Sequence, residues 1–338
     1  MITKIFEKDL LASWLSIFSK LLPLIVIIPY LLVYFTTPIV NIWLIFLSFY
    51  SIGILFEFGF TSTFERFISY SRSKASKKIK FQFSFAETVY SAKKIFSYLF
   101  IISIFVLLTV GSALIYKPIN SINIESSSSK IEEFYFLWIF VAISTSVALY
   151  NFFFASFFRG SNRIFDYRIR ESAANLITTL LSIMSLHFFK DFFTFCLIYF
   201  SASLLTFLLL RGKFKSVFKS TEIKTKSSPV MRYAWGSAWR SGLGVIFSVG
   251  AINMIGIVLA QFVDAVELGK FLLSVRIIQS FAAISNPFFY IKIPQMALIY
   301  NENDRQKAEK IGSQRLMVTM TFFISLLLLF TALYPFIN

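Results

Sequence analysis

Cysteine, histidine and acidic side chains are scarce in this 338-residue chain. Cys196 is the only cysteine and His187 the only histidine, which excludes an internal disulfide and argues against zinc sites and histidine-dependent chemistry. Charged residues make up 15% of the chain, whereas soluble domains carry about 25%. No glycine-rich phosphate loop or nucleophile elbow is visible. We therefore expect no metal, no cofactor and no soluble catalytic domain.

Apolar side chains are abundant instead, at 57% of the chain with a mean hydropathy of +0.73. They fall into about nine runs of roughly 20 residues, the length that crosses a bilayer core of about 30 Å. The first run is too long for a cleavable signal peptide, and Lys20 interrupts it. The sequence thus predicts an all-α polytopic membrane protein with about nine transmembrane helices. The predicted spans are Leu11–Phe35, Ile42–Thr63, Ile95–Tyr116, Phe134–Phe158, Ala173–Phe189, Phe192–Leu210, Gly242–Gln261, Leu268–Tyr290 and Leu316–Leu333.

The 33 basic residues are distributed very unevenly between the predicted loops. When the loops alternate between two sides, 28 basic residues fall on the side of the N-terminus, four on the other, and Arg276 inside a span. Basic loops stay in the cytoplasm, so the N-terminus is predicted to be cytoplasmic. The net charge of +16 sits in short loops rather than on one groove, which argues for a lipid bilayer and against nucleic acid as the partner.

A weak internal repeat divides the chain. A shift of about 226 positions places Pro38–Ser48 on Asp264–Ser274 with the same hydrophobic pattern, and places the third span on the ninth. We therefore predict a six-helix N-terminal lobe, residues 1–215, and a partial three-helix lobe, residues 216–338. The alternative is chance similarity between two apolar hairpins.

Three charged side chains lie inside predicted spans, where an ionised group costs a few kcal/mol on insertion scales. Glu57 is one or two turns from the end of the second span and is a candidate for coupling to H⁺ or Na⁺; the alternative is a locally paired carboxylate. Lys20 is about nine residues into the first span and precedes Pro23 and Pro29, which can bend a helix beside a cavity. Arg276 is about nine residues into the eighth span and is the strongest functional candidate; the alternative is a buried structural ion pair.

Further arginines lie at inner ends of the spans. Arg66 and Arg240 are candidates for cations of a substrate cavity, and Arg159 and Arg163 for its cytoplasmic mouth. A mouth lined by several such cations would attract an anionic headgroup. For each one alone, ordinary positive-inside anchoring is the competing interpretation.

Several stretches together resemble one family, the O-antigen and polysaccharide flippases of the multidrug/oligosaccharidyl-lipid/polysaccharide exporter superfamily. Glu57-Phe58-Gly59-Phe60 followed by Arg66 resembles the family's acidic-x-Gly-x…Arg signature. Inner and outer loops of the family are similar to Phe158–Arg163, Ala265–Phe271, Ile293–Met296 and Asn303–Arg305. These motifs are loose one by one, but they occur in order over nearly the whole chain.

The resemblance implies two pseudo-symmetric helical lobes around a central cavity and movement of an undecaprenyl-diphosphate-linked oligosaccharide between leaflets of a bacterial inner membrane. It implies cavity cations at Lys20, Arg66 and Arg276, and a polysaccharide polymerase and chain-length regulator as partners. The chain departs from the family at Asn253, where many relatives have an acid. It also has about nine predicted helices where relatives have twelve or more.

Two other functions compete with a flippase. A membrane polymerase or acyltransferase should have a large outside loop, but the longest one predicted here is only Lys117–Glu133. A drug or cation exporter of the same superfamily should have more acidic than basic cavity residues, the reverse of Lys20 and Arg276. We therefore favour a flippase without covalent chemistry.

Overall fold

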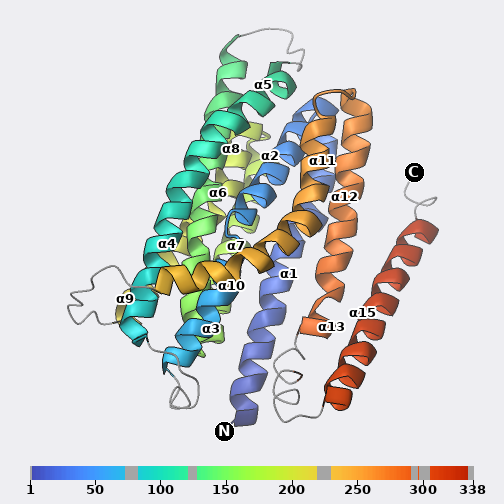
Figure 1. Ribbon diagram of the computed structural model, residues 1–338. Coiled ribbons are helices and arrows are strands. Elements are labelled where there is room, and N and C mark those ends of the chain that lie inside the picture. The colour runs from blue at the N-terminus through green and yellow to red at the C-terminus, as the bar shows by residue number, and fades with distance from the viewer. Residues whose placement is uncertain are drawn as a thin grey trace. The chain divides into compact units, whose positions relative to one another are not determined.

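Helices form all the regular secondary structure in the described part of the chain (Figure 1). The computed structural model describes residues 2–72, 83–120, 128–218, 230–290, 296 and 305–333. Long apolar runs favour helices in a bilayer because a helix satisfies its own backbone hydrogen bonds. The all-α prediction is therefore confirmed. By its contacts the chain divides into two compact units, Met1–Leu272 and Leu273–Asn338.

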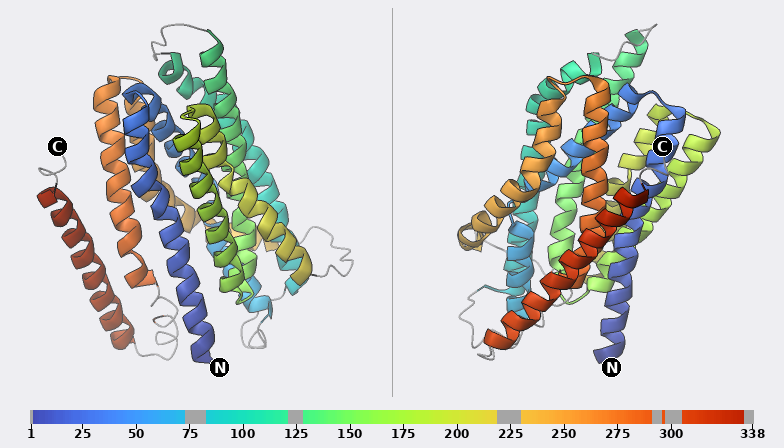
Figure 2. Two further views of the ribbon diagram at one scale, coloured as in Figure 1. Left: turned by 180° about the vertical axis from the view of Figure 1, so that it is seen from behind. Right: turned by 90° about the vertical axis from the view of Figure 1, so that its right-hand side faces the viewer.

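The N-terminal unit holds most of the helices. In chain order they are α1 (Ile2–Tyr34), α2 (Thr37–Leu55), α3 (Phe60–Arg72), α4 (Phe85–Val106), the π-helical turn η2 (Leu107–Gly111), α5 (Ser112–Asn120), α6 (Ser128–Gly160), α7 (Ile164–Phe188), α8 (Phe192–Phe200), α9 (Ala202–Val217), α10 (Val230–Val245), the π-helical turn η3 (Ile246–Gly250), α11 (Ala251–Leu259) and the first part of α12 (Ala265–Ser285). Figure 2 shows this unit from two further sides.

Each predicted span overlaps one or more of the observed helices. Within the described residues, seven helical stretches are long and apolar enough to cross a membrane. The predicted fifth and seventh spans are not among them, although α7 occupies the fifth and the α10–η3–α11 segment the seventh. Helix α7 carries several polar residues, among them Glu171, Asn175, Thr178 and Thr179, which lowers its hydropathy. The predicted number of nine exceeds the seven found by length and composition.

The second predicted span is not one helix, which corrects the expected Ile42–Thr63. Helix α2 ends at Leu55 and α3 begins at Phe60. Between them Phe58 and Gly59 adopt left-handed backbone conformations, with φ of 46° and 73°. A left-handed residue cannot continue a right-handed helix, and only glycine adopts that conformation without strain.

Helix α10 approaches this break closely. A Cβ atom on Gly242 would lie 2.7 Å from the Phe58 carbonyl oxygen, so glycine is required there for the two backbones to meet. The contact joins α10 to the segment between α2 and α3. In Figure 1, α10 crosses the N-terminal unit at a steep angle to α4 and α6.

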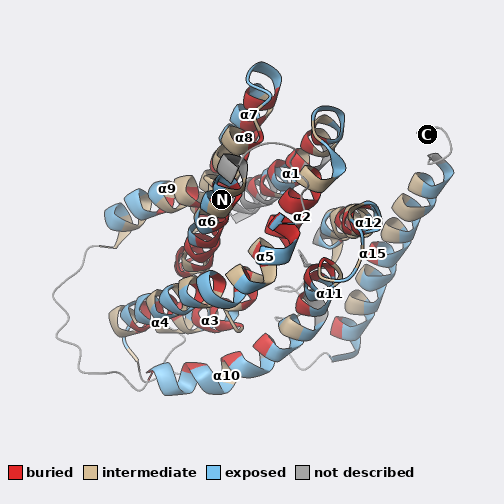
Figure 3. Ribbon diagram, turned by 90° about the horizontal axis from the view of Figure 1, so that it is seen from above, coloured by how far each residue is buried: buried red, intermediate tan, exposed pale blue. Residues whose placement is uncertain are grey.

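Helix α6 forms the centre of the N-terminal unit and packs against α2, α3, α4, α8 and α9. Its buried side chains include Trp138, Phe153, Phe157 and Phe158. The Phe157 ring meets Phe214 of α9 edge to face, with centroids 4.7 Å apart. Such pairs add about 0.5–1.5 kcal/mol beyond the area they bury. Figure 3 shows buried residues concentrated along α6 and α2, and exposed residues along α10.

Helices α1 and α7 make the most extensive pairing in the chain. Ile27 and Leu31 of α1 are fully buried, and Leu186 of α7 is fully buried as well. Ser16 and Ser19 of α1 are also buried, which places polar groups inside the bundle where they need partners. This pairing positions the candidate site.

The C-terminal unit contains the rest of α12, the short α13 (Pro287–Tyr290) and α15 (Arg305–Leu333). The Phe281 and Phe330 rings lie 5.8 Å apart, and the Phe288 and Phe322 rings lie 5.1 Å apart. Most described side chains of α15 are exposed or half-buried. The contacts divide the chain after Leu272, whereas the sequence predicted lobes at 1–215 and 216–338; that assignment and the internal repeat stay predictions. The motifs Ile293–Met296 and Asn303–Arg305 lie outside the described residues except for Met296 and Arg305.

Candidate functional site

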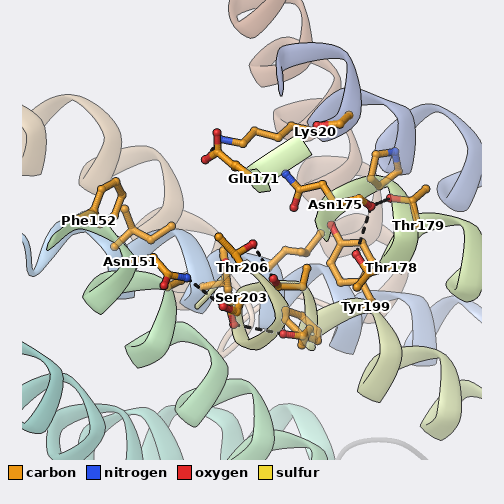
Figure 4. Close-up of a pocket in the computed structure, with 18 of the residues that line it drawn as sticks. Lys20, Asn151, Phe152, Glu171, Asn175, Thr178, Thr179, Tyr199, Ser203 and Thr206 are labelled. Atoms are coloured by element: carbon orange, nitrogen blue, oxygen red, sulfur yellow. Dashed lines mark hydrogen bonds and ion pairs between the residues drawn. The ribbon is translucent and has the colours of Figure 1, made fainter. Parts of the chain in front are cut away.

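A cavity of about 360 Å³ lies inside the N-terminal unit (Figure 4). Helices α1, α2, α6, α7, α8 and α9 contribute its wall. A volume of this size is at the lower end of the range for ligand pockets, about 300–1,000 Å³. The polar side chains in the wall are Ser19, Lys20, Tyr50, Asn151, Arg159, Tyr167, Glu171, Asn175, Thr178, Thr179, Tyr199, Ser203 and Thr206.

The charged end of the cavity is built on Glu171, whose side chain is 11% exposed. Lys20 Nζ of α1 donates to Glu171 Oε1 at 2.8 Å, and Arg168 Nη1 of α7 donates to Oε2 at 2.9 Å. The hydroxyls of Ser16 and Tyr167 also donate to the carboxylate, at 2.7 Å and 3.0 Å. Two cations and two hydroxyls therefore stabilise the ionised form of a carboxylate that would otherwise be unfavourable at this depth.

Tyr167 and Arg159 extend this cluster. Burial raises the pKa of Tyr167 above its usual range, and the Glu171 charge adds to the shift, so the phenol stays a proton donor. The Arg159 guanidinium lies over the Tyr167 ring at 5.2 Å and also lies 4.0 Å from the Glu65 carboxylate of α3. Arg159 thus lines the cavity with a weak ionic partner.

A stripe of polar residues on α7 forms one side of the cavity wall, and the sequence-based prediction did not include it. Glu171, Asn175, Thr178, Thr179 and Ser182 recur at spacings of three and four, which places them on one face of a helix. The stripe lies in an otherwise apolar span, and that periodicity is the signal that could have found it. Glu171 was missed because it lies just before the predicted start of the fifth span at Ala173.

Lys20 and Arg159 are the predicted site residues that the structure brings into this cavity. Three other predicted arginines do not line it. Arg66 Nη2 donates to Ser237 Oγ of α10 at 3.0 Å, the exposed Arg240 lies over the Trp239 ring at 5.7 Å, and Arg163 Nη1 lies 3.7 Å from Asp166 Oδ2. These contacts leave the predicted roles of the three arginines as predictions.

Glu57 lies in the break between α2 and α3. Its Oε2 atom accepts hydrogen bonds from the Thr61 backbone N–H, at 3.1 Å, and from the Thr61 hydroxyl. A carboxylate in this position satisfies free N–H groups at the start of α3 and interacts favourably with the helix dipole. The local pairing considered as the alternative is therefore present, while coupling to an ion stays a prediction.

Arg276 belongs to the C-terminal unit and is 6% exposed. Its Nη1 atom donates to Gln279 Oε1 at 2.9 Å, one turn further along α12. Within the described parts of the chain, no group of three or more histidine, cysteine, aspartate or glutamate residues could hold a metal ion.

Comparison with known proteins identifies a solved structure with a similar fold. No protein-family model matches the chain, and no curated protein matches its sequence. A solved structure, the MATE transporter ClbM in complex with Rb⁺, is similar over 99% of this chain and 72% of that one, with a TM-score of 0.60 and 14% identity. The chain has a MATE-like fold. At this identity the likeness extends to the architecture alone. The superfamily and the polysaccharide flippase that the sequence resembles therefore stay predictions.

Proposed function

We propose that this protein is a transporter that flips an undecaprenyl-diphosphate-linked oligosaccharide, such as an O-antigen repeat unit, from the cytoplasmic to the periplasmic leaflet. The observation that carries the proposal is the charge of the cavity wall, where Lys20 and Arg159 outnumber Glu171. A polyanionic headgroup entering a low-dielectric path needs compensating positive charge. The MATE-like fold supports a transporter.

The contacts of Glu171 suggest how the cavity would accept an anion. The Lys20 side chain is half exposed, and it contacts a carboxylate that has three other donors. If Lys20 turned to a substrate phosphate, Arg168 would still neutralise Glu171, so no buried charge would be left unpaired. Lys20 is therefore the exchangeable member of the cluster. The oligosaccharide would then be released for a polysaccharide polymerase and a chain-length regulator.

A reconstituted transport assay tests the proposal. The purified chain is placed in vesicles with a fluorescent undecaprenyl-diphosphate-linked sugar, and its transfer is followed by protection from a quencher on one side. We expect transfer above protein-free vesicles, and at least a tenfold loss for Lys20→Gln, which removes the charge and keeps a polar side chain. Ser216→Ala, an exposed change at the end of α9, is the matched control. Equal transfer by the parent and by protein-free vesicles would overturn the proposal.

A drug or cation exporter is the second candidate, and two observations favour it. Glu171 places a carboxylate in the cavity wall, and the structure with the similar fold was determined with Rb⁺. Efflux of a fluorescent organic cation from the same vesicles distinguishes the candidates. Under this candidate Lys20→Gln should increase cation efflux, because it removes the ammonium that competes for Glu171.

The proposed location is a bacterial inner membrane with a cytoplasmic N-terminus. Cys196 is fully buried, so its background labelling should be low, and Cys196→Ala removes it altogether. In that background, Asn120→Cys at the end of α5 should react with an impermeant thiol reagent added to intact cells, and Ser216→Cys should react only after permeabilisation. Both positions are exposed. The opposite labelling pattern would reverse the orientation inferred from the basic loops.

A further inference from the structure

The cavity has a second end whose polar groups take no part in the Glu171 cluster. Asn151 of α6, Asn175 and Thr178 of α7, and Thr206 of α9 line it, and all four are uncharged. Figure 4 shows Asn175 between the Lys20–Glu171 pair and the Thr206–Ser203 side of the wall. The wall is therefore divided into a charged part and a neutral polar part.

Asn151 has an unused hydrogen-bond acceptor. Only 6% of the residue is exposed, and its Nδ2 atom donates to the Ser203 carbonyl oxygen at 2.9 Å. Its Oδ1 atom is buried and accepts no hydrogen bond from any described residue. Buried amide oxygens are normally paired, because leaving one unpaired forfeits its hydration without a replacement. A donor O–H group entering the cavity would supply the partner.

Asn175 has a side chain with all its hydrogen-bonding capacity available. It lies one turn after Glu171 on the same face of α7. Within the described residues, its side-chain amide makes no hydrogen bond, and Figure 4 shows it extending from α7 into the space beside Glu171. An amide offers two donor hydrogens and an acceptor oxygen, so it can bind a hydroxyl group in either direction.

The two threonines present acceptors. Thr178 Oγ1 donates to the Ala174 carbonyl at 2.9 Å, and Thr206 Oγ1 donates to the Ala202 carbonyl at 2.8 Å. Each hydroxyl hydrogen is thus committed to its own helix, and the oxygen lone pairs remain for a ligand. A wall rich in neutral acceptors fits a ligand with several O–H donors and no charge. Lys20 and Arg159 at the other end disfavour a cationic one.

We infer that Asn151, Asn175, Thr178 and Thr206 form a subsite for a sugar, next to the Lys20 ammonium that takes the adjoining phosphate. The inference rests on the proposed function and adds to it the part of the substrate that this cavity recognises. A volume of about 360 Å³ suits one sugar with its phosphate rather than a whole oligosaccharide. The remaining sugars would extend out of the cavity.

Binding of soluble probes to the purified full chain in lipid nanodiscs tests the subsite. Displacement of radiolabelled glucose 1-phosphate is measured with unlabelled glucose 1-phosphate, inorganic phosphate and methyl glucoside. In the parent, glucose 1-phosphate should bind about tenfold more tightly than inorganic phosphate, as one or two additional hydrogen bonds provide. Asn175→Ala should remove most of that advantage and leave the affinity for inorganic phosphate unchanged.

Matched variants keep the result interpretable. Thr206→Val preserves the shape of the side chain and removes the acceptor. It should therefore reduce the sugar advantage, that is, the ratio of the affinity for glucose 1-phosphate to that for inorganic phosphate, without unfolding the protein. Lys20→Gln should lower the affinities for glucose 1-phosphate and for inorganic phosphate by the same factor. This variant therefore separates binding in the cavity from binding to surface lysines. Asn120→Ala, outside the cavity, should change neither affinity.

The outcomes separate the subsite from the proposed function. Equal affinities of the parent for glucose 1-phosphate and phosphate, or a sugar advantage that survives both Asn175→Ala and Thr206→Val, would mean that this end holds only water. A sugar advantage in a chain that does not flip the lipid-linked sugar in vesicles would preserve the subsite and overturn the transport proposal. Displacement of the radiolabelled probe by methyl glucoside but not by inorganic phosphate, lost in Asn175→Ala, would support the subsite and reject the phosphate assignment of Lys20. Binding of no sugar probe by the parent would reject the subsite.

Discussion

Lys20 and Arg276 are two basic side chains that the sequence places at similar depths in predicted spans, and the structure gives them different surroundings. The Lys20 side chain is half exposed in a cavity and contacts the Glu171 carboxylate at 2.8 Å. Arg276 is 6% exposed and donates to the neutral amide of Gln279. Depth in a span is thus a poor guide to how a membrane cation is held.

The difference suggests different roles for the two cations. Lys20 keeps part of its hydration and a flexible stem, so it can change partners at low cost. Arg276 is confined, and its planar guanidinium presents donors in a fixed geometry suited to phosphate. We therefore expect substitutions at Arg276 to act on transport and substitutions in the Lys20 cluster to act on both transport and stability.

The largest expected effect is loss of transport in Arg276→Ala. Losing a buried charged hydrogen bond between Arg276 and the substrate diphosphate should cost about 2–5 kcal/mol of binding free energy. Transport should therefore fall by about 30-fold or more. Protein level should stay near that of the parent, because the change removes an embedded charge. The measurement is surface polysaccharide in a complementation assay, with protein quantified by immunoblot. Arg276→Lys should restore only part of the activity, since a point charge lacks the bidentate fork.

Lys270→Ala is the control for this pair, because Lys270 is exposed on the same helix. It should complement as well as the parent chain. If Arg276→Ala also complements fully, Arg276 is a structural charge and the proposed grip on the diphosphate is wrong. If the parent chain itself fails to complement, the vesicle assay replaces complementation for all three variants.

The next largest effect is on stability. Within the cluster of Lys20, Arg168 and Glu171, substituting Glu171 should destabilise the protein more than substituting Lys20. Glu171→Gln leaves Lys20 and Arg168 facing each other without a carboxylate, which should cost about 2 kcal/mol after allowance for the exposure of Lys20. Lys20→Met should cost less than about 1 kcal/mol, because Arg168 still neutralises Glu171. Thermal unfolding of the purified proteins in one detergent measures both. The double variant should be less destabilised than the sum of the two single changes.

A Lys20→Met variant as unstable as Glu171→Gln would contradict this ranking. It would show that Lys20 is a fixed member of the cluster, and an exchange of Lys20 from Glu171 to a substrate phosphate would lose its support. Arg168→Met is the companion measurement. Because Arg168 is less exposed than Lys20, at 23% against 50%, its removal should cost more than that of Lys20.

The helices were accessible from sequence because hydropathy over about 20 residues is a strong local signal. The break at Phe56–Gly59 was not, because Phe58 gives no warning that it will adopt a φ of 46°. Gly59 was the only local sign of it. Gly242 opposite the break is explained only by the three-dimensional contact, 184 positions away in the chain.

The candidate site was only partly accessible for a related reason. Lys20 was found because a charge inside an apolar run is conspicuous. Its partner Glu171 lies 151 residues away, and one sequence contains no signal that joins the two. The polar stripe of α7 was readable from its spacing but was obscured by the basic loop before it. Arg66 and Arg240 illustrate the opposite difficulty and their roles stay predictions, since a basic residue at a span end has no sequence signature that separates a cavity cation from an anchor.

The smallest expected effect on stability concerns Glu57. Two substitutions there distinguish a side chain that only caps α3 from one that also couples transport to an ion. Glu57→Gln keeps an oxygen that can accept from the Thr61 N–H and hydroxyl, so the free energy of unfolding should change by less than about 0.5 kcal/mol. Glu57→Ala removes that oxygen and should cost about 1 kcal/mol. If Glu57 also couples an ion, Glu57→Gln should slow turnover in vesicles far more than it weakens substrate binding, because an amide cannot take up a proton at neutral pH. A Glu57→Gln variant with the parent's turnover, beside a destabilised Glu57→Ala, would limit Glu57 to capping α3. Set against Lys20 and Arg276, that result would leave the cations as the functional charges of the predicted spans.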